Sequence, residues 1–230
     1  MLQGPNPHTS LSLIHQADLY NEIFAPPIQD LPVLLVQDMM IAADIMGRRI
    51  FGFTSSHPRI SNLLKTSSEK HLAWLIAAMS PWKNQPMFLA ENNTPAAARA
   101  IEEGLRRPNS ESGTVAKAFA NWKVVECMVI KEGHWGRGKM ALQMRALGAD
   151  WKNQVGASLM FELMDQKQNT NNGEGEERIM DKYETFLKTI AEKGLEGAVD
   201  FKSLLKVSPP VFLPGIAEEQ LIARAIRAMK

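Results

Sequence analysis

Each end of the chain carries a short amphipathic segment, and prolines separate both segments from the middle of the sequence. The N-terminal segment, residues 11–24, precedes Pro26 and Pro27, and the C-terminal segment, residues 216–229, follows Pro214. Neither is long enough to form a stable helix alone in water. Each apolar stripe must therefore pack on the core of its own chain or on a neighbouring subunit.

Composition and charge indicate a protein with a real core and no membrane segment. Hydrophobic residues make up 45% of the 230 residues, and the formal net charge is +1. The longest apolar stretch, residues 31–46, contains Gln37, Asp38 and Asp44, and it is shorter than the roughly 20 residues of a membrane span. The single cysteine, Cys127, excludes an internal disulfide and is typical of a reducing compartment. We expect no signal peptide, no membrane insertion and a cytoplasmic location, with the virion as a further possible location.

Helical periodicity dominates the sequence, which predicts an all-α fold of two helical lobes. The expected helices cover residues 11–24, 31–46, 58–65, 71–79, 95–107, 139–147, 150–164, 178–193 and 199–207. Residues 48–57 are expected to form a basic and aromatic loop.

Two helix starts have recognisable capping residues. Thr66 and Glu69 are spaced as a capping box, in which the hydroxyl and the carboxylate bind backbone N–H groups of the first turn. Thr94 followed by Pro95 predicts a capping hydroxyl with a proline at the first helical position.

The centre of the chain is ambiguous. Residues 114–130 are spaced as a helix, but residues 124–130 alone also fit a short buried β-strand, because they are rich in β-branched side chains. We favour the helix, since its neighbours are helical, and a minor β element near 124–130 stays open.

Polar residues divide the chain into four predicted parts. Residues 165–177 are rich in Asn and Gly and predict a mobile loop or a boundary between lobes. The predicted parts are an N-terminal arm (1–27), a central lobe with a basic region (28–166), an acidic lobe (167–207) and a C-terminal arm (208–230).

The nearly neutral net charge conceals basic and acidic regions. Residues 114–159 contain seven bases against three acids, and residues 44–83 contain six bases against two acids. Residues 165–200 contain nine acids against five bases. A basic cleft on a less basic body is typical of proteins that bind a nucleic-acid backbone, although ordinary solvated surfaces give similar local charges.

Residues 133–139 match the glycine and lysine spacing of a phosphate-binding P-loop. The next residue is Met140, where a P-loop needs Ser or Thr to bind magnesium. We therefore interpret this segment as a set of backbone donors and cations for a phosphate, as in a nucleic-acid backbone. Trp135 is the best candidate for stacking an unpaired base, whereas Trp122 is expected in the core.

No catalytic or metal-binding set is recognisable. The five histidines lack metalloprotease spacing, and Cys127 has no cysteine partner. We expect a non-enzymatic protein without cofactors.

These observations favour a helical assembly protein that coats single-stranded RNA through a basic cleft and polymerises into filaments or rings by exchanging its terminal arms. In layout, the chain resembles the nucleocapsid proteins of negative-strand RNA viruses. The predicted RNA-binding residues are Arg48, Arg49, Lys123, Lys131, His134, Trp135, Arg137, Lys139, Arg145 and Lys152. The predicted oligomerisation residues are Leu13, Leu19, Ile23, Phe24, Phe212, Leu213, Leu221, Ile222 and Ile226. Two alternatives stay open: a helical matrix or adaptor protein that binds partner proteins, and an enzyme that binds a phosphate or nucleotide at residues 133–139.

Overall fold

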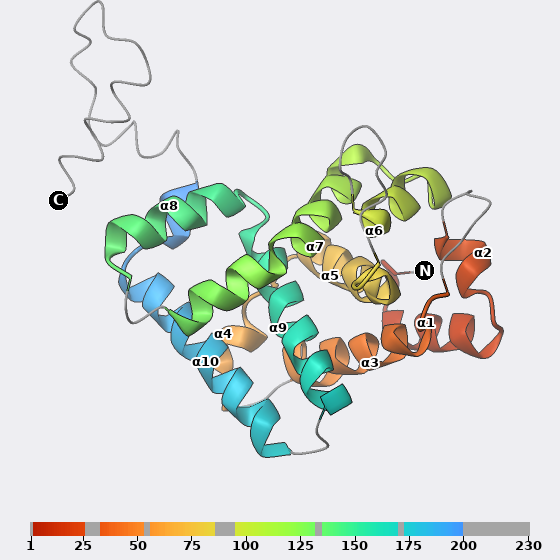
Figure 1. Cartoon of the computed structure of the whole chain (residues 1–230), viewed down its shortest axis with the longest axis horizontal. Helices are drawn as coiled ribbons and strands as arrows, with labels where there is room; N and C mark the ends of the chain where they lie inside the picture. The colour runs from red at the N-terminus through yellow and green to blue at the C-terminus, as the bar shows by residue number, and fades with distance from the viewer. Residues whose placement is uncertain are drawn as a thin grey trace, which may run out of the picture.

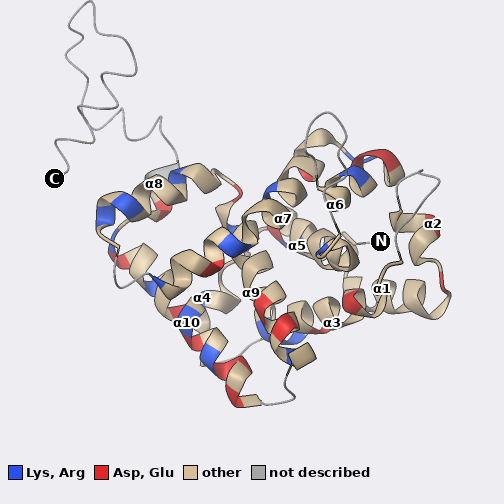
Figure 2. Cartoon of the chain, in the orientation of Figure 1, with Lys and Arg blue, Asp and Glu red and all other residues tan. Residues whose placement is uncertain are grey.

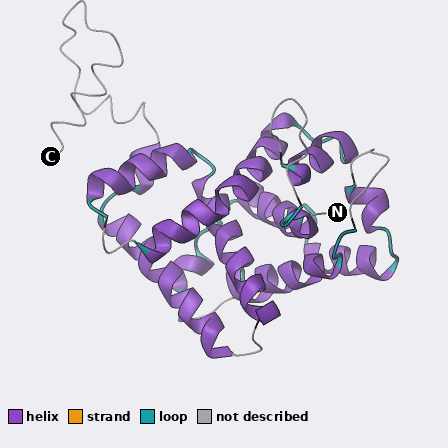
Figure 3. Cartoon of the chain, in the orientation of Figure 1, coloured by secondary structure: helices purple, strands orange, loops and turns teal. Residues whose placement is uncertain are grey.

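The computed structural model describes residues 2–25, 33–52, 56–85, 95–131, 135–169 and 173–199. These residues form helices and no strand (Figure 3), so the predicted all-α class is confirmed. The helices, in chain order, are α1 (Pro7–Gln16), α2 (Tyr20–Phe24), α3 (Gln37–Ile45), η1 (Met46–Ile50), α4 (Pro58–Ser61), α5 (Ser67–Ala78), η2 (Ser80–Trp82), α6 (Ala96–Arg99), η3 (Ala100–Gly104), α7 (Asn109–Ile130), α8 (Arg137–Leu147), α9 (Trp151–Asn169), α10 (Gly173–Glu192) and η5 (Glu196–Val199).

Helix α9 lies at the centre of the molecule, and α3, α5, α7 and α10 pack around it (Figure 1). Its side chains are buried on all sides between Trp151 and Met164, except those of Lys152 and Glu162, which are partly exposed. A helix that is buried on every side has no amphipathic stripe, which explains why its sequence pattern looks irregular. The buried apolar residues from α1 to α10 form one continuous cluster.

The N-terminal segment packs on the body of its own chain. Leu11, Ile14, Tyr20 and Phe24 are buried, and the Tyr20 hydroxyl donates a hydrogen bond to the carbonyl oxygen of Ala78 at 3.0 Å. The expected single helix is two helices, α1 and α2, because the chain turns between them. In this structure of one chain, residues 2–25 are part of the body.

The helix predicted for residues 31–46 begins later and ends later than expected. Its first two residues lie outside the described part, and α3 begins at Gln37. The chain does not leave the helix at Gly47 but continues as the π-helical turn η1, Met46–Ile50. The loop predicted for residues 48–57 is therefore wrong at its start, since residues 48–50 are helical, while residues 53–55 lie outside the description.

The capping box before α5 is confirmed. Thr66 Oγ1 accepts a hydrogen bond from the Glu69 N–H at 3.1 Å, and Glu69 Oε2 accepts one from the Thr66 N–H at 2.8 Å. The start of α6 differs from the prediction: Pro95 is its N-cap residue, without a side-chain cap, and Thr94 lies outside the described residues.

Helix α7 resolves the central ambiguity. It runs without interruption from Asn109 to Ile130, so residues 124–130 are helical and the open β-strand alternative was wrong. Val125, Met128 and Val129 face the core, so one side of the helix buries the β-branched side chains of Val125 and Val129.

The loop predicted for residues 165–177 is also wrong. Helix α9 extends to Asn169 and α10 begins at Gly173, which leaves only residues 170–172 between them, outside the description. The expected lobe boundary between residues 166 and 167 consequently falls inside α9. Helix α10 packs on α4, α7 and α9. The helix expected over residues 199–207 lies almost entirely outside the described part.

Candidate nucleic-acid interface

The predicted RNA-binding residues do not share one surface, and several are bound to carboxylates. Arg48 Nε lies 2.6 Å from Asp44 Oδ1 in an exposed ion pair. Arg49 extends to the start of α10, where its guanidinium contacts Glu176 at 2.5 Å and Glu177 at 3.3 Å. The positive charge of η1 is thus balanced within the chain.

Lys123 and Lys152 are likewise paired. Lys123 Nζ lies 2.8 Å from Glu126 Oε2 and 4.0 Å from the ring centroid of Trp122. Lys152 Nζ lies 3.2 Å from the capping carboxylate of Glu69. Burial opposes ionisation of Glu69, but its bonds from the Thr66 and Lys65 backbones and from Lys152 outweigh burial and lower its pKa.

Helix α8 presents a different kind of surface. Met140, Met144 and Leu147 recur at helical spacing and are buried, so the polar residues between them face outward. Arg137, Lys139 and Arg145 are exposed, and the helix contains no Asp or Glu (Figure 2). Gly148, with φ of 77°, ends the helix in a conformation that favours glycine.

The first turn of α8 is tied to the end of α10. Arg137 Nε donates to the carbonyl oxygen of Lys193 at 3.1 Å, and Lys193 Nζ donates to the carbonyl oxygen of Trp135 at 3.3 Å. Trp135 is half-buried against the core, and Lys139 Nζ lies 4.7 Å from its ring centroid. A base that stacks on this face of Trp135 would therefore have to displace Lys139. Gly133 and His134 lie outside the described residues.

Lys131 extends this basic region at the end of α7, which contacts α8. Its side chain is exposed and has no carboxylate partner among the residues that the structure describes. We define the α8 basic surface as Lys131, Arg137, Lys139 and Arg145. Nothing at the start of α8 supports a P-loop, because Met140, at the position where a P-loop binds magnesium, is fully buried in the core.

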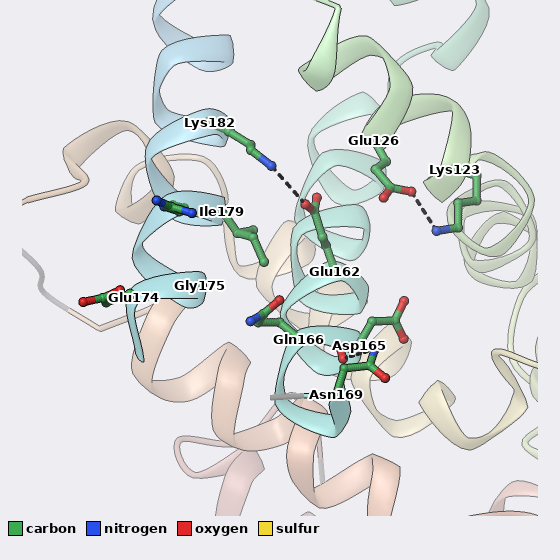
Figure 4. A pocket seen from close by; sticks show the side chains of 11 residues that line it. Lys123, Glu126, Glu162, Asp165, Gln166, Asn169, Glu174, Gly175, Ile179 and Lys182 are labelled. Carbon is green, nitrogen blue, oxygen red and sulfur yellow. Dashed lines mark hydrogen bonds and ion pairs between the residues drawn. The ribbon is translucent and has the colours of Figure 1, made fainter. Parts of the chain in front are cut away.

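A polar pocket of about 510 Å³ lies between α7, α9 and α10 (Figure 4). Glu162 lies at its centre, with Oε1 3.9 Å from Lys182 Nζ and with a buried Oε2 that has no hydrogen-bond partner. Burial raises the pKa of the Glu162 carboxyl, and the opposing effect of Lys182 is smaller. Glu162 was not among the predicted site residues, although an acid within the apolar stretch 155–164 of α9 was a visible signal.

A partly buried ion pair lies at the edge of the pocket, which Asp165 helps to line. Lys83 Nζ contacts Asp165 Oδ1, donates to the carbonyl oxygen of Phe161 at 3.2 Å and lies 4.6 Å from the ring centroid of Trp122. Burial lowers the pKa of Lys83, although Asp165 opposes the shift. Trp122, which was expected in the core, is partly buried against it and packs on Phe161 with ring centroids 5.7 Å apart.

The predicted oligomerisation residues fall into three groups. Leu13 and Leu19 are exposed on the N-terminal helices, with 59% and 44% of their surfaces accessible. Ile23 is half-buried and Phe24 is buried in the chain's own core. The remaining residues lie outside the described part: Phe212, Leu213, Leu221, Ile222 and Ile226.

Among the described residues, no three His, Cys, Asp or Glu side chains are placed to hold a metal ion. Within the same ranges, every helix is too short or too polar to cross a bilayer. The chain matches no protein-family model, no curated protein and no solved structure.

Proposed function

We propose that this chain is a non-enzymatic helical assembly protein that binds the backbone of single-stranded RNA through the α8 basic surface. The observation that carries the proposal is the contrast between the cations. Arg48, Arg49, Lys123 and Lys152 are bound to carboxylates. In contrast, the exposed Arg137 of α8 contacts a carbonyl oxygen and the exposed Lys139 contacts the ring of Trp135, and α8 itself contains no acid.

The chemistry of α8 suits phosphate. Binding of an RNA backbone depends on cations that neutralise phosphates and release condensed counterions. Lys and Arg residues that are already paired with a carboxylate bind a phosphate less favourably, because the ion pair must first be broken. The start of α8 adds unpaired backbone N–H groups, which favour an anion.

Assembly is the second part of the proposal. An RNA-coating protein must contact its neighbours, and a segment donated from one copy to the next gives rings or filaments. The N-terminal helices are packed on their own body, so the C-terminal segment is the better candidate for an exchanged arm. The exposed Leu13 and Leu19 stay available as a further apolar contact.

The test is the salt dependence of RNA binding. The double variant Arg137→Ala/Lys139→Ala should weaken binding to a single-stranded oligonucleotide and reduce the slope of log K against log salt by about 0.7 for each lost phosphate contact. The charge-matched control is Lys70→Ala/Lys188→Ala, which removes two exposed lysines on α5 and α10 and should leave the slope unchanged. Equal slopes for both double variants and the parent protein would refute the proposed interface.

A further inference from the structure

The outer face of α7 is apolar although it is exposed. Ala120, Val124, Cys127 and Ile130 follow one another at intervals of four, three and three residues, which places them on one side of the helix. Val124 is 43% exposed and Ile130 is 58% exposed. The opposite side of the helix is occupied by the buried residues Val115, Ala118, Val125, Met128 and Val129. We define the four exposed residues Ala120, Val124, Cys127 and Ile130 as the α7 apolar face.

A surface helix normally buries one stripe and exposes polar residues on the other. The outer side of α7 carries this apolar stripe beside the exposed Lys123, and the stripe stays exposed although the described helices pack around α7. Exposed apolar residues grouped on one side of a helix are a candidate interaction site. Lys131 stands at the end of the stripe, without a carboxylate partner in the described ranges.

The C-terminal segment of the same sequence has complementary features. Residues 216–229 carry Leu221, Ile222, Ile226 and Met229 at helical spacing, and the segment needs a partner to be stable as a helix. Its first turn contains Glu218 and Glu219. If the two helices pack antiparallel, these acids approach Lys131 and the apolar stripes face each other.

The position of the last described residues makes the contact possible. Helix η5 ends at Val199 and packs on α8, which in turn contacts α7. Sixteen residues, 200–215, separate η5 from the C-terminal segment, and an extended linker of that length spans up to about 50 Å. The linker contains Pro209, Pro210 and Pro214, and prolines make a linker stiffer and more extended.

We propose that the α7 apolar face of one copy is the docking site for residues 216–229 of a second copy. The inference rests on the proposed function for its premise that copies assemble, and it deepens that function by naming the receiving surface. Each copy both donates and receives a segment, so the contact is heterologous and propagates into a ring or filament.

The single cysteine allows a direct test, because Cys127 is exposed in the middle of the α7 apolar face. The full-length Ile222→Cys variant, freed of nucleic acid by nuclease, is oxidised by air with a copper catalyst and run on a non-reducing gel. A disulfide forms only when the two Cβ atoms approach to about 4 Å. The expected result is a ladder of covalent dimers and larger species that disappears in the Ile222→Cys/Cys127→Ser variant.

The matched control is Gln220→Cys, which lies on the opposite side of the predicted helix and should give several-fold less product. Equal yields from both positions would overturn the proposal. A disulfide within single chains, seen as a monomer of faster migration, would overturn it too, since the segment would then dock on its own body.

A second variant covers the case in which the introduced thiol disturbs folding. Val124→Asp changes an exposed residue, so the chain should fold normally, while its particles should become smaller in size-exclusion chromatography. Unchanged particle size would contradict the proposed docking site. The outcome is separable from the proposed function, because RNA binding through α8 is measured independently with Arg137→Ala/Lys139→Ala.

Discussion

Arg49 donates from Nη2 to Oε2 of Glu176 at 2.5 Å and joins the π-helical turn η1 to the first turn of α10, 127 residues further along the chain. The contact is one of a row along α10. Asp181 Oδ1 lies 3.1 Å from His57 Nε2, and the Glu184 carboxylate accepts hydrogen bonds from the backbone N–H groups of Arg59 and Ile60 at the start of α4. The acidic region therefore binds part of the basic region 44–83 of the same chain, through the side chains of Arg49 and His57 and the backbone of α4.

Arg49→Ala should lower the free energy of unfolding, because it leaves Glu176, which is 13% exposed, without its cation. A double-mutant cycle with Glu176→Gln should give a coupling energy of about 1 kcal/mol, near the upper end for partly exposed ion pairs. Chemical denaturation of the four proteins measures it. The control is the more exposed pair of Arg48 with Asp44, for which we expect weaker coupling. Zero coupling between Arg49 and Glu176 would show that this contact does not hold α10 in place.

Two leucines of α1 test whether the N-terminal helices belong to the body. Leu11 is fully buried and Leu13, two residues later, is 59% exposed. Leu11→Ala should destabilise the chain by roughly 2–5 kcal/mol, as for other buried leucines, and Leu13→Ala should change stability by less than about 0.5 kcal/mol. Thermal or denaturant unfolding compares the two variants. Similar small effects would mean that α1 is not packed on its own core in solution.

Glu162→Gln should raise the free energy of unfolding at pH values above the acidic range. Burial raises the pKa of Glu162 in the folded state above the value of 4.5 for a free side chain, so the folded state holds this proton more tightly than the unfolded state. Stability is then lost as the pH rises from 4.5 through the folded pKa, and the neutral amide does not suffer this loss. Denaturant unfolding at pH 4 and pH 8 should show equal stabilities at the lower pH and a more stable variant at the higher pH.

The control for this pH dependence is Glu192→Gln, which changes a 62% exposed carboxylate at the end of α10. Stability of the Glu192→Gln variant should depend on pH at least as strongly as stability of the parent protein does. A Glu162→Gln variant that is less stable than the parent at pH 8 would mean that the ion pair with Lys182 outweighs the cost of burying the carboxylate.

Features that depend on neighbours in sequence were predictable. The capping box of Thr66 and Glu69 forms within one helical turn, so four residues suffice to specify it. The apolar spacing of Met140, Met144 and Leu147 predicts which side of α8 is buried, and consequently that Arg137 and Lys139 are exposed. The basic character of the candidate interface was visible for the same reason.

Predictions failed where packing overrides local preference. The polar residues 165–169 form the end of α9 and residues 173–177 form the start of α10. Contacts with Asp38, Lys83 and Arg49 satisfy side chains of these two segments. Residues 124–130 are rich in strand-forming side chains, but they belong to the continuous helix α7, which buries three of the seven against the core.

The sequence alone determined the helical class, the capping box before α5 and the buried face of α8, because these follow from periodicity and from hydrogen bonds within a turn or two. Only the tertiary structure decided which charges remain available. Arg49 is bound by Glu176, which lies 127 residues away in the sequence, and only the packing of the helices around α9 brings the two side chains together.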